Sequence, residues 1–192
     1  MRNVYMAVGA VLAAAALALS GCATGAASTD LQFTPDSERA IVVIGVEGFD
    51  QWRGMSALLH YRGVDASGNF ERRNFSVSNG NGWMPMESTE YFVVEVDPGT
   101  YVASGMMTHT GYSQINTTFC LGTISFVAPA GQAVYVGNLQ VPRMGASILP
   151  RPPNMEAAAA KLSEYPGVQQ SLTPAVMQDV PYPPSRMCDR RR

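Results

Sequence analysis

Thioether and imidazole side chains gather in two short stretches of the sequence. The first stretch carries Met84 and Met86, and the second carries Met106, Met107 and His109. Thioether ligands select Cu(I), so a copper(I) site is one chemistry that these residue types could support. The simpler interpretation is that the methionines fill irregular gaps at the end of a core, as methionine commonly does. The sequence leaves copper as an alternative only.

Groups for acid, base or nucleophilic catalysis are sparse. The two histidines of the chain are His60 and His109, and there is no Gly-x-Ser-x-Gly elbow for a nucleophile. His60 lies in an apolar run and is expected to be satisfied within a sheet. Glu90 and Glu95 are an odd number of residues apart, so they would point to opposite faces of one strand. The sequence therefore predicts no enzyme and no cofactor, the Cu(I) alternative aside.

The charge pattern excludes one class of partner. Thirteen basic and fifteen acidic side chains give a net charge of −2, and the basic residues form no stripe. Nucleic-acid binding requires a concentrated positive surface. We therefore expect no nucleic-acid partner.

The first residues have the form of an export signal that ends at Cys22. Arg2 supplies a positive start, and residues 7–19 form an apolar run of the length expected for a secretory signal. As a helix this run would be roughly 20 Å long, whereas the hydrocarbon core of a bilayer is about 30 Å thick, so the run is too short to serve well as a transmembrane anchor. Residues 1–21 are predicted to be a cleaved signal peptide.

The stretch Leu19-Ser20-Gly21-Cys22 resembles the lipobox of bacterial lipoproteins. That resemblance implies cleavage before Cys22, diacylation of its sulfur and acylation of the new amine, and several acyl chains make a durable anchor. Ala23 is not the aspartate that commonly keeps such proteins at the inner membrane, so the resemblance points to the outer membrane, on its periplasmic face. The competing interpretation is an ordinary signal with a chance cysteine.

The segment after Cys22 and the remaining cysteines give two further expectations. Residues 22–37 are mostly small and polar, a composition that predicts a flexible tether. If Cys22 is lipidated, Cys120 and Cys188 remain, and an oxidising compartment favours a disulfide between them. Closing that loop would stabilise the fold by roughly 4 kcal/mol in the chain-entropy model. Two free thiols are the alternative.

Strand patterning dominates residues 38–142. The first apolar run is β-branched and apolar on both faces, which suits a central strand covered on both sides. The expected strands are residues 40–46, 55–61, 70–77, 91–96, 101–106, 123–128 and 133–139. Seven strands without an intervening helix predict an all-β protein, an antiparallel sandwich of prealbumin or immunoglobulin type.

Two of the connections carry clear turn chemistry. Asp97-Pro98-Gly99-Thr100 has proline and glycine in the order of a type II turn, so residues 91–96 and 101–106 are predicted to form a hairpin. That pairing would bring the two methionine stretches to one end of the fold. Residues 123–128 and 133–139 are expected to form a second pair. By the period of two, Phe92, Val94 and Val96 are predicted to face the core.

The turn motifs also carry a family resemblance. Val96-Asp97-Pro98-Gly99-Thr100-Tyr101, followed by Phe126 to Asn138 with its Pro129-Ala130-Gly131 turn, is similar to uncharacterised bacterial lipoproteins of prealbumin-like sandwich fold. The resemblance covers roughly residues 39 to 142. It implies the fold and supplies no catalytic residue.

Residues 143–192 leave the strand pattern. A helix-forming run begins at Met155, with Asn154 as the expected N-cap and Glu156 in the first turn, where a negative charge is favourable. We expect one short helix whose alanine-rich face packs on the sandwich, followed by an extended tail. The whole sequence predicts a lipid-anchored, non-enzymatic binding or structural module whose partner is an envelope protein or a cell-wall component.

Overall fold

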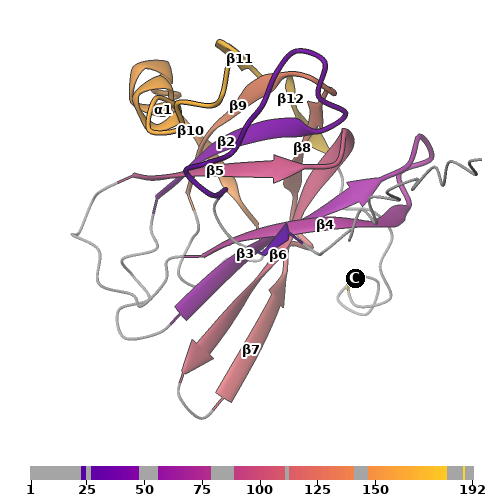
Figure 1. The fold of residues 1–192 in the computed structure, drawn as a ribbon. Helices are drawn as coiled ribbons and strands as arrows, with labels where there is room; N and C mark the ends of the chain where they lie inside the picture. Colours follow the sequence, from indigo (N-terminus) through magenta and orange to yellow (C-terminus); the bar gives the residue numbers. More distant parts are fainter. Residues whose placement is uncertain are drawn as a thin grey trace, which may run out of the picture.

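The computed structural model describes residues 23–24, 27–47, 56–78, 89–110, 113–140, 147–180 and 188. Two β-sheets pack face to face, and one short helix lies on the outside of one of them (Figure 1). This confirms the predicted all-β sandwich with a short helix near its C-terminal end.

The larger sheet has seven strands in the order β1-β4-β3-β6-β8-β12, with β7 beside β6. Its strands are β1 (Ala23–Thr24), β3 (Ser56–Val64), β4 (Phe70–Ser78), β6 (Gly99–Thr110), β7 (Ser113–Thr118), β8 (Thr123–Ala128) and β12 (Met177–Val180). The smaller sheet has the order β10-β9-β2-β5, with β11 beside β9. It contains β2 (Ala40–Glu47), β5 (Glu90–Val96), β9 (Ala133–Gln140), β10 (Leu149–Arg151) and β11 (Leu172–Pro174), and the helix α1 covers Met155–Leu162.

All seven predicted strands form, but the two predicted hairpins are wrong. β5 belongs to the smaller sheet and β6 to the larger one, so the turn between them is a corner that carries the chain from one sheet to the other. Gly99 has a φ of 144° there, and the Tyr101 hydroxyl donates to the Asp97 carbonyl oxygen at 2.7 Å. A tyrosine whose hydroxyl hydrogen-bonds to the backbone a few residues upstream, called a tyrosine corner, is known from β-sandwiches. β8 and β9 are likewise split between the two sheets.

The strand pairing is mixed and not wholly antiparallel. β2 runs antiparallel to β5 but parallel to β9, from Ile41 opposite Ala133 to Glu47 opposite Gln140. Parallel neighbours arise here without a βαβ helix, because the chain reaches β9 by crossing from the larger sheet at the β8–β9 corner. Local turn chemistry predicts the bend but cannot predict this crossing.

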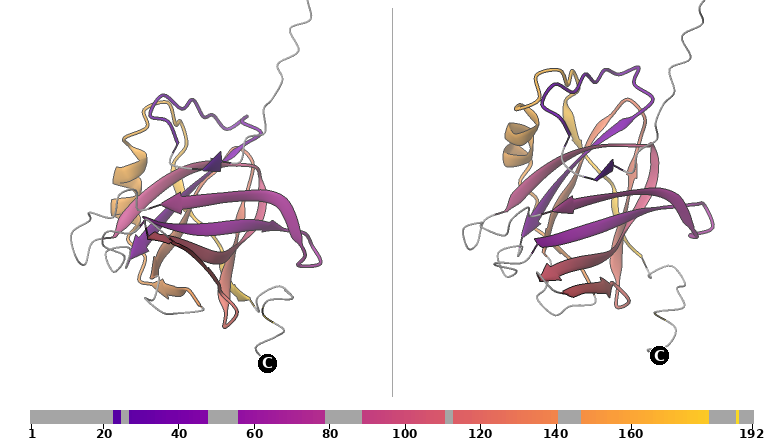
Figure 2. Two further views of the ribbon diagram at one scale, coloured as in Figure 1. Left: turned by 90° about the horizontal axis from the view of Figure 1, so that it is seen from below. Right: turned by 60° about the horizontal axis from the view of Figure 1, so that its bottom comes forward.

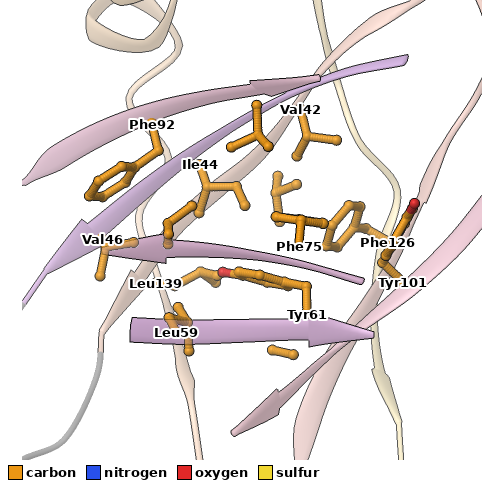
Figure 3. Packing of buried hydrophobic residues seen from close by; sticks show 14 of the residues in the cluster. Val42, Ile44, Val46, Leu59, Tyr61, Phe75, Phe92, Tyr101, Phe126 and Leu139 are labelled. Atoms are coloured by element: carbon orange, nitrogen blue, oxygen red, sulfur yellow. The ribbon is translucent and has the colours of Figure 1, made fainter. Parts of the chain in front are cut away.

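The main core lies between the two sheets (Figure 3). Four aromatic residues from the larger sheet form its centre, where Tyr61 stacks on Phe75 with ring centroids 4.6 Å apart and Tyr101 stacks on Phe126 at 5.9 Å. The smaller sheet contributes the inner faces of β2 and β5. The prediction that Phe92, Val94 and Val96 face the core is confirmed.

A second apolar cluster lies between the smaller sheet and α1. Ile41 and Val43 point to this side of β2, which is therefore buried on both faces as predicted. Ala158 and Leu162 are the buried residues of α1. The side chain of Asn154 accepts a hydrogen bond from the Ala157 amide at 3.0 Å, so the predicted N-cap is confirmed.

The segments before and after the predicted domain are part of the fold. Phe33 lies within the expected tether of residues 22–37, yet it is buried in the second cluster, and its backbone bonds to Gly167 and Gln169. Ala27 and Leu31 pack against the same cluster, so three apolar side chains hold this otherwise polar segment on the fold. The C-terminal extension supplies β10 and β11 to the smaller sheet and β12 to the larger one.

Candidate binding groove

A groove of about 680 Å³ crosses the outer face of the larger sheet, the face that points away from the main core. Its walls come from β3, β4, β6 and β7. The lining residues are His60, Tyr61, Arg62, Phe70, Glu71, Arg72, Asn74, Ser104, Gly105, Met106, Asn116, Thr117 and Thr118. In Figure 1 β3, β6 and β7 lie low in the view and α1 lies above, beside the smaller sheet, and the left view of Figure 2 shows the fold from below.

The shape of the groove depends on how β6 changes partner. The first residues of β6 pair with β8, and the residues from Gly105 onward pair with β7. A side chain at Gly105 would collide with the carbonyl oxygen of Thr117. Because glycine has no side chain, β7 approaches β6 closely enough to form one wall of the groove. Asn74 and Arg72 on β4 stand on the opposite side.

Two arginines give the groove its charge. The Arg62 guanidinium lies over the Phe70 ring, 3.9 Å from its centroid, and Arg72 is exposed on the neighbouring strand. Within the described residues neither arginine forms an ion pair. Glu71 also lines the groove, but its carboxylate pairs with Arg73. The groove therefore presents unneutralised positive charge in a chain whose net charge is −2.

His60 lies at the floor of the groove and is half-buried. Burial lowers its pKa below the usual value, which favours the neutral imidazole. Its Nδ1 is 2.7 Å from the hydroxyl oxygen of Ser76, directly across from it on β4, and the Ser104 hydroxyl donates to its backbone carbonyl oxygen at 3.2 Å. His60 is thus satisfied within the sheet, as predicted.

Two further arginines hold the β5–β6 corner and not the groove. Arg39 pairs with Asp97 and lies 3.8 Å from a Glu95 carboxylate oxygen. Arg73 donates to the Pro98 carbonyl oxygen, and its guanidinium lies 5.6 Å from the Tyr101 ring centroid. Arg39 is paired with Glu95 and Asp97, and Arg73 with Glu71, so neither charge is available to a ligand.

The predicted metal ligands do not converge in the described part of the chain. Met106 is buried in the main core, whereas Met107 and His109 follow on β6 with increasing exposure, two residues apart on the other face. Met84 and Met86 lie outside the described residues. The hairpin that was expected to bring the two stretches together does not form. No group of three His, Cys, Asp or Glu side chains suited to a metal ion is found among the described residues.

The predicted cysteine pair is present. Cys120 and Cys188 form a disulfide with their Cα atoms 5.3 Å apart, across a sequence separation of 68. The bond ties the turn before β8 to the chain that follows β12. Cys22 lies outside the described residues.

Sequence reasoning missed the groove itself. The alternation of His60 and Arg62 with buried Leu59 and Tyr61 was a signal for one polar face on β3. β7 gave no such signal, because residues 113–116 are exposed on both faces and the strand lacks an apolar alternation. Without β7 the fourth wall could not be anticipated.

No family model, no curated protein and no solved structure matches this chain. The described ranges contain no helix with the length and hydropathy that crossing a membrane requires. The geometry of the groove is thus the main basis for assigning a function.

Proposed function

We propose that this protein is a lipid-anchored, non-enzymatic module of the bacterial cell envelope. Diacylated Cys22 holds it in the outer membrane on the periplasmic face, and the groove binds a cell-wall component or another envelope protein. The lipobox-like stretch Leu19-Ser20-Gly21-Cys22 supports the anchor. A family resemblance to uncharacterised lipoproteins of prealbumin-like fold agrees with it.

The groove is the observation that carries the binding role. It spans four strands, and its volume of about 680 Å³ lies in the range of pockets that take small ligands. Its side chains offer guanidinium, hydroxyl and amide groups for recognition. Ser76, whose hydroxyl lies beside His60, is a buried residue with only 6% of its surface exposed, so this pair is poorly placed to attack a substrate. These features favour binding over catalysis.

The anchor and the binding role are tested separately. Metabolic labelling with an alkyne fatty acid is expected to mark the wild-type protein and not the Cys22→Ser variant. Labelling that persists in Cys22→Ser would contradict the anchor.

Chemical crosslinking in intact cells, followed by mass spectrometry, tests the groove. The substitution Asn74→Trp fills the groove from an exposed position and leaves the core untouched. We expect a specific adduct from the wild type that is lost in Asn74→Trp. Recovery of the same abundant bystander proteins from both would count against the proposal.

Copper(I) binding is the alternative function. Met107 and His109 share the outer face of β6, which is the one feature of the described residues that favours it. Because Met106 points into the core, the site would have to form without it. Titration of the reduced protein with Cu(I) against a competing chelator decides the matter, and the absence of binding tighter than about micromolar would end this alternative.

A further inference from the structure

The groove carries a charge pattern that points to the chemical class of its ligand. Arg62 and Arg72 project from neighbouring strands on the same face of the sheet. Arg62 lies opposite Asn74, and Arg72 is two residues along β4 from Asn74. The register of β3 and β4 shifts just beyond this pair, between Arg62 and Val64, and both arginines line the groove. Two guanidinium groups can therefore converge on one anionic group.

Arg62 is oriented before any ligand arrives. Its guanidinium lies on the Phe70 ring, and this cation–π contact restricts the side chain while leaving its N–H groups free for an acceptor. A guanidinium presents its donors in a planar fork that matches a carboxylate. Preorganisation of this kind reduces the entropy lost on binding.

The rest of the lining is polar and uncharged. Asn74, Asn116, Thr117 and Thr118 offer amide and hydroxyl groups that both donate and accept hydrogen bonds. Such groups suit a ligand with many hydroxyls. Phe70 is covered by Arg62, so it is not an apolar side chain free to enter a membrane, as interfacial binding would require.

We propose that the groove binds an acidic saccharide, with Arg62 and Arg72 on its carboxylate and the amide and hydroxyl side chains on its sugar hydroxyls. This inference rests on the proposed binding role of the groove and names the ligand class for that same site. It makes an acidic saccharide, and not a partner protein, the ligand of the groove.

The test uses the full protein in nonionic detergent micelles and isothermal titration calorimetry. The probe is the disaccharide of N-acetylglucosamine and N-acetylmuramic acid, whose lactyl group carries a carboxylate, and the matched neutral probe is its methyl amide. We expect the acid to bind at least about tenfold more tightly than the amide, since a charge-assisted bond contributes about 1.4 kcal/mol or more. Its affinity should fall as salt is raised.

Three substitutions locate the effect. Arg62→Gln and Arg72→Gln are each expected to weaken binding of the acid about tenfold and to leave binding of the amide nearly unchanged. Arg62→Lys keeps the charge but removes the fork, so an intermediate loss is expected. Arg151→Gln removes a positive charge from β10 on the smaller sheet and should change nothing. Thermal unfolding of each variant verifies that these exposed substitutions preserve the fold.

The outcomes separate this inference from the function on which it rests. If acid and amide bind equally and Asn74→Trp abolishes both, the groove binds a saccharide but the role of the carboxylate is wrong. If the acid fails to bind while crosslinking in cells still depends on the groove, the ligand class is wrong and the binding role stands. Binding to vesicles of anionic lipid that needs Arg62 and is not displaced by the disaccharide would assign the arginines to a headgroup and overturn the inference.

Discussion

The main core contains two tyrosines in matched aromatic surroundings but with opposite hydrogen bonding. Tyr61 and Tyr101 are both fully buried, and each ring contacts Phe75 and Phe126. The Tyr101 hydroxyl donates to the Asp97 carbonyl oxygen at 2.7 Å, and burial raises its pKa to about 12, so it keeps the proton that it donates. Among the described residues the Tyr61 hydroxyl has no hydrogen-bond partner.

Substitution of each tyrosine by phenylalanine should therefore have opposite consequences. Tyr101→Phe removes a hydrogen bond that closes the β5–β6 corner, and we expect a loss of about 1 kcal/mol in the free energy of unfolding. In a chain of this length that corresponds to a fall of about 2–4 °C in Tm. Tyr61→Phe removes a hydroxyl whose burial is uncompensated, so we expect no loss and a gain of up to about 1 kcal/mol.

Urea unfolding followed by far-UV circular dichroism measures both effects on the full protein with its disulfide intact. The midpoint should move to lower urea for Tyr101→Phe and stay or rise for Tyr61→Phe, with the m value unchanged in both. The aromatic rings remain in place, which makes each variant the control for the other. The reasoning is refuted if Tyr61→Phe loses as much stability as Tyr101→Phe.

Three further predictions concern the Cys120–Cys188 disulfide, His60 at the floor of the groove and Gly99 at the β5–β6 corner. Replacing both Cys120 and Cys188 by serine should lower the free energy of unfolding by up to about 4 kcal/mol under non-reducing conditions. Equal urea midpoints for the variant and the wild type would contradict a stabilising role of the disulfide. Burial lowers the pKa of His60, so the stability that its neutral form confers is complete above about pH 6.5 and is lost as pH falls toward the folded-state pKa. His60→Gln should flatten the fall of the urea midpoint between pH 7.5 and 5, and an unchanged pH profile would count against this. Gly99→Ala should destabilise by about 1–3 kcal/mol, because alanine there adopts a strained φ and its Cβ collides with Arg73, and a variant with wild-type Tm would show that the corner relaxes freely.

Much of the fold could be predicted from the sequence because alternation of apolar residues reports burial directly. β2 is apolar from Ala40 to Val46, and the structure buries each of these residues. The inner face of β5 and the N-cap at Asn154 follow from period and capping chemistry in the same way. These features depend on residues close together in sequence.

The pairing of strands could not be predicted because a turn motif is local. Asp97-Pro98-Gly99-Thr100 has the composition of a hairpin turn, but the strands on either side diverge into different sheets. Whether two strands pair or separate depends on the partners that each finds elsewhere, here β2 for β5 and β3 for β6. The burial of Phe33 depends in the same way on distant residues.

The groove was beyond sequence reasoning for a related reason. Arg62 and Arg72 come from consecutive strands, and their shared face follows only when the register is known. Asn116 lies on β7, whose sequence lacks the alternation of apolar residues that would predict a strand. Three strands that were predicted and one that was not meet at one surface.

Site-specific photocrosslinking in intact cells tests the central claim most directly. A photoreactive residue is placed at Asn116 in the groove and, in a matched protein, at Glu156, which is exposed on α1 beside the other sheet. The account predicts a discrete adduct from position 116, lost in Asn74→Trp, and none of that kind from position 156. Equal adducts from both positions, or an adduct from position 156 alone, would contradict the claim that the groove is the binding surface.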